Sequence, residues 1–216
     1  MSSFTESIKV AKDLAIWLNE KTNEREIPGA IRVRTGVAIL QLSLDLGDAM
    51  LVLLEANLPG PALTLARPLF EGYVRGVWLL ECASDASVEK FNDGKCPLFP
   101  ELLNAIGTDE LTGGAWIHAN KNANWGAFND LTHGGSEHVK RRSAKDAVEA
   151  NYPESELEAL VNLGIEVRIR IGASLLALMN DETAMEQLNR KAKAHRLAPS
   201  SVSPSGTAKL ARHPSR

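Results

Sequence analysis

The sequence has few of the residues and none of the short motifs by which many enzyme classes are recognised. Its 216 residues include two cysteines, Cys82 and Cys96. These do not form a C-x-x-C pair, which argues against a disulfide framework and a structural zinc site. The glycine-rich phosphate loops, the G-x-S-x-G elbow and the H-E-x-x-H helix are absent. We therefore predict no cofactor and no metal, and the sequence leaves open whether the protein is an enzyme.

Long uninterrupted apolar runs are also missing. Residues 2–12 are polar, and no apolar segment typical of a signal peptide follows them. The two most apolar stretches, 37–58 and 61–83, are both interrupted by charged residues, which would be costly inside a bilayer. These residues are Asp45, Asp48, Glu55, Arg67, Glu71 and Arg75. We expect no membrane span and a cytoplasmic location.

Aromatic residues make up only 5% of the chain, so the core must be largely aliphatic, a composition that favours helices. Charge is unevenly distributed along the sequence. From Arg190 to Arg216 there are seven Lys and Arg residues and no Asp or Glu, whereas the other 17 basic residues accompany all 27 acidic ones. An acidic body of this kind is a poor general surface for nucleic acid.

Apolar residues recur with helical spacing through most of the chain. The pattern predicts helices over 5–24 and 31–57, a third from the Pro-Gly-Pro break at 59–61 to 83, two short ones within 84–107, and others over 122–132, 151–179 and 182–195. Residues 108–121 fit either a loop or a helix start near Thr112. We predict an all-α protein: one bundle of about four to six helices over residues 1–195, followed by a disordered basic tail over 196–216.

The third predicted helix carries a stripe of charge. Arg67, Glu71 and Arg75 are four residues apart and therefore share one face. The stripe fits an exposed ladder, a buried triad that fixes the helix register, or two guanidiniums placed to hold an anion. Pro68 either kinks this helix beside Arg67 or stands in the first turn of a helix that begins there.

A second unusual segment contains Asn129, Asp130 and His133, followed by Gly134 and Gly135. On a helix, the three polar residues lie within one turn of each other. An imidazole beside a carboxylate can perform acid–base catalysis, so these are the candidate catalytic residues. The segment equally fits an ordinary helix end, where a histidine meets the helix dipole and a glycine ends the helix.

These two segments resemble those of a group of uncharacterised bacterial helical proteins. The resemblance rests on residues 58–61 and 67–71, on Val74-Arg75-Gly76 and Trp78-Leu79, and on the Asn-Asp-x-Thr-His-Gly-Gly stretch at 129–135. It covers about residues 30–180. It implies a helical fold and no particular activity.

The chain is also loosely similar to the HEPN superfamily of helical proteins. Its nuclease members are metal-independent ribonucleases of toxin and defence systems, with an Arg and a His separated by four to six residues on one helix. Arg190 and His195 have this spacing, at the edge of the basic tail. The similarity implies ribonuclease activity, which in this chain would use His133 with Arg67 or Arg75 brought close by the fold.

Two functional hypotheses follow. In the first, the protein is a helical binding or interaction module that forms a homodimer. Its Arg67, Glu71 and Arg75, with the 129–133 segment, form either a structural polar network or a pocket for a small anion. In the second, it is a ribonuclease-like or other phosphate-directed enzyme with His133 as acid or base. The second hypothesis requires the two polar segments to face each other.

Overall fold

The computed structural model describes residues 3–27, 29–109, 113–144 and 146–197, and the regular secondary structure of this part of the chain is all helical, with no strand. The all-α prediction is confirmed, but the expected four to six helices were too few. The helices are α1 (Ser3–Thr22), α2 (Ile31–Glu55), α3 (Pro59–Thr64), α4 (Ala66–Glu81), α5 (Asp85–Asn92), α6 (Phe99–Ile106), α7 (Gly114–Thr132), α8 (Ser136–Lys140), α9 (Glu154–Leu178) and α10 (Glu182–Leu197).

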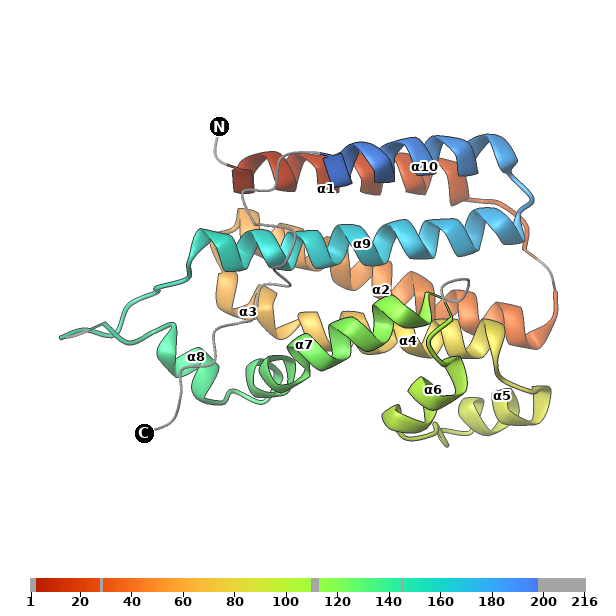
Figure 1. Cartoon of the computed structure of the whole chain (residues 1–216), viewed down its shortest axis with the longest axis horizontal. Helices are drawn as coiled ribbons and strands as arrows, with labels where there is room; N and C mark the ends of the chain where they lie inside the picture. Colours follow the sequence, from red (N-terminus) through yellow and green to blue (C-terminus); the bar gives the residue numbers. More distant parts are fainter. Residues whose placement is uncertain (1–2, 28, 110–112, 145, 198–216) are drawn as a thin grey trace.

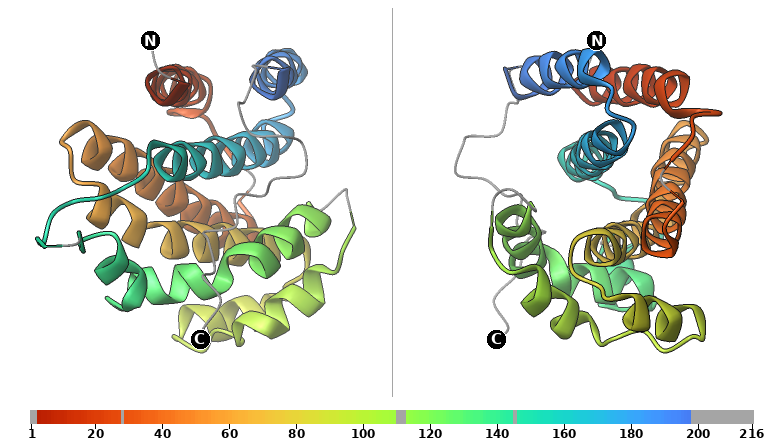
Figure 2. Two further views of the ribbon diagram at one scale, coloured as in Figure 1. Left: turned by 60° about the vertical axis from the view of Figure 1, so that its left-hand side comes forward. Right: turned by 90° about the vertical axis from the view of Figure 1, so that its right-hand side faces the viewer.

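The helices are arranged around α9. Figure 1 shows α1 and α10 side by side above α9, with α2 and α4 below it and α5, α6 and α7 on the far side of α4. The end-on view of Figure 2 shows the same order. The two candidate segments lie on α4 and at the end of α7, within the lower half of the molecule.

Small residues allow α2 and α4 to pack closely. A Cβ at Gly76 would lie 2.3 Å from the Leu40 side chain, and one at Gly36 would lie 2.8 Å from that of Leu80. The facing positions on the two helices therefore combine a glycine with a leucine, which fills the space that the missing side chain leaves. This tight pair holds α4 rigidly and presents its polar edge to α7.

The break between α3 and α4 leaves a backbone carbonyl that bonds to the end of α7. A new helix begins at Ala66, so Pro68 stands in its first turn and does not kink a longer helix. Proline has no N–H, so the carbonyl of Thr64 lacks its usual helical donor. The Thr132 hydroxyl donates to that carbonyl at 3.4 Å and thereby joins the end of α7 to α3.

Helix α2 is long and apolar enough to cross a membrane by length and composition alone. Its most apolar 18-residue window has a mean hydropathy of 1.8, and 39% of that window is buried. One face packs against α4, and Arg168 of α9 pairs with Asp48 of this helix. Leu42 and Val52 remain 49% and 63% exposed.

The predicted boundaries of other elements need revision. Helix α7 begins at Gly114, well before residue 122, and α8 occupies a stretch where no helix was expected. Asp181 caps α10, since its Oδ1 accepts from the Ala184 N–H at 2.9 Å. Of the predicted tail, residues 198–216 lie outside the described residues, so the boundary at 195 and the disorder beyond it remain predictions.

Candidate functional site

Arg67 lies where α4 meets the end of α7, and three side chains hold its guanidinium. Its Nε donates to Glu71 Oε1 at 2.7 Å, and its Nη1 lies 2.8 Å from His133 Nε2. The guanidinium also lies over the Trp125 ring, 5.1 Å from its centroid. Because an arginine only donates, Nε2 of His133 must accept here, and the proton of the neutral imidazole is on Nδ1. The two polar segments therefore do face each other.

Glu71 joins two arginines. Its second oxygen, Oε2, pairs with Arg75 Nη2 at 2.8 Å. Side-chain exposure is 23% for Arg67, 13% for Glu71 and 31% for Arg75. The stripe is therefore neither an exposed ladder nor a fully buried triad. It is a half-buried cluster in which one carboxylate neutralises one of two guanidiniums, and His133 lies at its exposed edge.

The few aromatic residues are concentrated where they position this cluster. Phe70, fully buried on α4, has the rings of Phe99, Trp116 and Phe128 within 6.3 Å of its own centroid. Phe99 in turn stacks on Trp125 at 4.4 Å with an interplanar angle of 10°. Such pairs contribute beyond simple burial. The aromatic contacts thus fix α6 and α7 against α4 and hold Trp125 beneath Arg67.

Asp130 faces away from the Arg67 cluster. Its Oδ2 accepts from the Glu137 N–H at 2.5 Å and from the Ser136 hydroxyl at 3.2 Å, so this carboxylate caps the first turn of α8. No hydrogen bond joins Asp130 to His133 in the part of the chain that the structure describes. Asn129 contributes its backbone carbonyl, which accepts from the His133 N–H at 3.1 Å.

The turn between α7 and α8 depends on its two glycines. Gly134 has a φ of +69°, a left-handed conformation that ends α7. At Gly135, a Cβ would lie 2.0 Å from Asp130 Oδ1, so a side chain there would displace the capping carboxylate. The Gly-Gly pair therefore acts as the predicted helix end, and it also allows Asp130 to reach α8.

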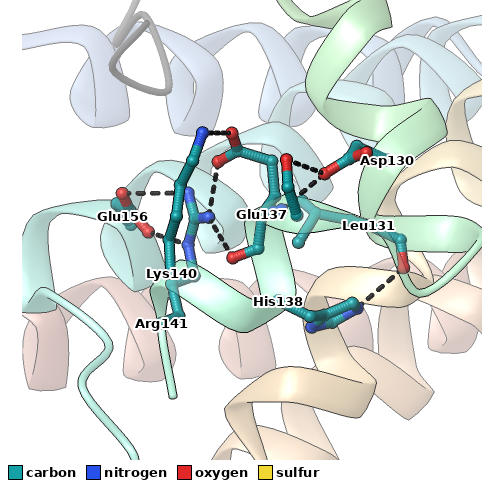
Figure 3. A network of polar contacts seen from close by, with 8 residues as sticks. Asp130, Leu131, Glu137, His138, Lys140, Arg141 and Glu156 are labelled. Carbon is teal, nitrogen blue, oxygen red and sulfur yellow. Dashed lines mark hydrogen bonds and ion pairs between the residues drawn. The ribbon is translucent and has the colours of Figure 1, made fainter. Parts of the chain in front are cut away.

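A network of ion pairs follows directly and ties α8 to the start of α9 (Figure 3). Buried Arg141 donates to both carboxylate oxygens of Glu156 and to the side chain and backbone carbonyl of Glu137. Lys140 Nζ pairs with Glu137 at 2.7 Å. Burial alone would raise the pKa of Glu137, but hydrogen bonds from Lys140 and Arg141 outweigh it and lower that pKa. Burial opposes the charge of Arg141, yet its two carboxylate partners raise its pKa.

His138 lies beside the network and points toward α3. Its Nε2 is 2.7 Å from the Leu131 carbonyl and 3.3 Å from Thr64 Oγ1. A carbonyl only accepts, so Nε2 carries the proton. Neither His138 nor Arg141 was a predicted site residue. Their partners are brought together by the turns at 133–135 and 141–153, and spacing along the sequence does not reveal such contacts.

The HEPN-like pair lies elsewhere in the molecule. Arg190 and His195 are on α10, which packs against α9 and α1, whereas His133 ends α7 on the opposite side of α9 (Figure 1). The fold therefore brings Arg67, not Arg190, next to His133. Within the described ranges, no group of three or more His, Cys, Asp or Glu side chains gathers to hold a metal ion.

Comparison with known proteins places the chain in one family. Residues 40–198 match the model of a family described as Family of unknown function (DUF6988), and the chain belongs to that family. The matched region contains both candidate segments and the residues that contact them. Searches of curated proteins and of solved structures gave no match.

Proposed function

We propose that this protein is a cytoplasmic helical binding module whose Arg67, Glu71, Arg75 and His133 cluster binds a small anion such as phosphate or a carboxylate. The observation that carries the proposal is the fixed orientation of Arg67, which is held by Glu71, His133 and Trp125 at once. A guanidinium already held in place loses little conformational entropy when it binds an anion.

Charge supports the same conclusion. Two guanidiniums share one carboxylate, so the cluster retains at least one net positive charge in a protein whose overall charge is −3. An anion at the cluster would pair with the guanidinium that Glu71 leaves unneutralised.

The test is a calorimetric titration with inorganic phosphate at constant ionic strength. We expect saturable binding to the wild type and about tenfold or greater weakening in Arg67→Gln and Arg75→Gln, since each loses a charge-assisted hydrogen bond. Arg34→Gln is the matched control, because Arg34 is exposed on α2 and far along the chain from the cluster. Equal affinity in all four proteins, or no binding at all, would reject the proposal.

The contact between Arg67 and His133 favours a second candidate, a metal-independent ribonuclease. Cleavage of RNA without metal needs an acid or base near a group that stabilises charge on the phosphate, and these two side chains lie 2.8 Å apart. Asp130, engaged at α8, would contribute to this reaction only through the position of the turn. Asn129 has no separate part in it.

Incubation with total RNA in the presence of a chelator tests this candidate. Cleavage by the wild type that is lost in His133→Ala and in Arg67→Gln, with unchanged melting temperatures, would support a nuclease. Absence of cleavage by the wild type, or equal cleavage by both variants, would leave anion binding as the function of the cluster.

A further inference from the structure

A groove separate from the Arg67 cluster opens between the end of α2, helix α3 and the segment after α8. It has a volume of about 460 Å³ and is open to solvent. This volume is within the range of small-molecule sites. Its lining is largely apolar and consists of Leu53, Gly60, Pro61, Thr64, Leu65, His138 and Arg142. The apolar part suits a hydrocarbon body and not a polar ligand such as free phosphate.

Arg142 supplies a positive charge at this groove. The two basic residues that precede it are ion-paired, Lys140 to Glu137 and Arg141 to both Glu137 and Glu156. Arg142 itself has no carboxylate partner within the described ranges, and its guanidinium Nη2 would lie 3.2 Å from a Cβ at Gly60. A guanidinium beside an apolar groove complements a ligand with an anionic head and an apolar body.

The backbone that carries Arg142 is well anchored. The Glu149 N–H donates to the Arg142 carbonyl at 3.1 Å, and the Asn151 N–H donates to the Arg141 carbonyl at 2.8 Å. Arg141, one residue earlier, is buried in the ion-pair network of Figure 3. The network thus fixes the position from which the Arg142 side chain extends over the groove.

Two further polar groups lie near the same wall. The Tyr152 hydroxyl is buried without a hydrogen-bond partner among the described residues, and it would lie 2.7 Å from a Cβ at Gly60. His138 uses Nε2 to donate to Leu131, while its ring lines the groove. Because Gly60 has no side chain, Arg142 and Tyr152 can both approach its backbone closely.

We infer that this groove binds a small organic acid with an apolar body, such as a medium-chain carboxylate, with the carboxylate on Arg142 and the chain along Leu53, Pro61 and Leu65. This inference does not rest on the proposed function of the Arg67 cluster. The occupant is a free acid in solution, not a lipid within a membrane.

The test is a calorimetric titration of the full chain with hexanoate, octanoate and decanoate, each below its micelle-forming concentration. Each added methylene that is buried should strengthen binding up to about fourfold. Arg142→Gln should weaken octanoate binding about tenfold, and Pro61→Glu, which adds a negative charge at the groove, should abolish it. Arg34→Gln and Arg67→Gln should bind octanoate as the wild type does.

Three results would overturn the inference: no saturable binding of any of the acids, equal octanoate affinity in Arg142→Gln and wild type, or equally tight binding of decyltrimethylammonium. Co-sedimentation with phosphatidylglycerol vesicles without binding of free octanoate would also overturn it, in favour of a membrane surface. Loss of phosphate binding in Arg67→Gln with octanoate binding intact would show that the two sites are independent.

Discussion

Glu71 is the residue on which the charge balance of the Arg67 cluster depends. Replacing it with alanine leaves two half-buried guanidiniums without their shared carboxylate. We expect the free energy of unfolding to fall by about 2 kcal/mol. This is more than the weakest charge-assisted hydrogen bond contributes and less than the loss of one partner from a fully buried ion pair costs. For a chain of this size that lowers Tm by about 4–8 °C, measured by calorimetry or circular dichroism.

The matched control for this change is Glu55→Ala. Glu55 also forms an ion pair, with Lys12 at 2.7 Å, but both side chains are nearly half exposed. Exposed pairs contribute less than about 1 kcal/mol. If Glu71→Ala destabilises the protein no more than Glu55→Ala, the cluster does not stabilise α4 and the burial argument fails.

Asp130 is expected to act on structure more than on chemistry. In Asp130→Ala, the first turn of α8 loses its cap, a change that costs about 1 kcal/mol. Hydrogen exchange should become faster for residues 136–140, while phosphate binding at Arg67 stays within about twofold of the wild type. Loss of binding or of RNA cleavage with normal protection of α8 would instead give Asp130 a direct role in the site.

Among individual residues, the sequence predicted the contacts that helical spacing determines. Arg67, Glu71 and Arg75 are four residues apart, so their ladder follows from helix geometry. The Arg67–His133 contact joins residues 66 positions apart and depends on the packing of α4 against α7. Asp130 and His133 share a helical turn, yet Asp130 bonds to α8 because the glycine turn returns the chain to it.

At the scale of elements, the tie between α8 and α9 depends on pH. Glu137 has a lowered pKa in the folded protein, where it is hydrogen-bonded to Lys140 and Arg141. Its contribution to stability is therefore complete above its unfolded-state pKa and is lost as pH falls through the lower folded value. We expect wild-type Tm to fall more steeply than that of Glu137→Gln below about pH 4.5. Parallel Tm profiles of the two proteins would contradict this role of Glu137.

Helices with a sustained apolar pattern were predicted well, and α5 and α6 lie within 84–107 as expected, but the first turns of α7 and all of α8 were missed. The apolar periodicity of α1, α2 and α9 extends over many turns, which is why their predicted ranges agree with the structure to within a few residues. Helix α8 spans five residues and is held by Asp130 and Arg141, which come from outside it or from its end. Such an element has no periodic pattern to detect, and it is the one that positions His138 and Arg142.

At the scale of the whole molecule, α2 leaves apolar surface exposed. Leu42 and Val52 are 49% and 63% exposed, and at 100° per residue they lie within about 80° of each other on the helix. Ala38 and Ala49 fall in the same sector, as do the exposed charged residues Arg34 and Asp45. The composition of this helix, which also satisfies the length and hydropathy of a membrane span, is more apolar than a solvent-facing helix requires.

We propose that a second copy of the chain covers this face of α2, and that the protein is a homodimer. Light scattering after size exclusion should give twice the chain mass of 23.4 kDa for the wild type and a monomer for the double variant Leu42→Glu, Val52→Glu. A charge buried at either position opposes association because its desolvation is costly. Val148→Glu is the control, since Val148 is 87% exposed on the loop before α9 and its replacement should leave the dimer intact. A monomeric wild type at tens of micromolar would exclude the homodimer. A dimer that persists in the double variant would place the interface on another surface.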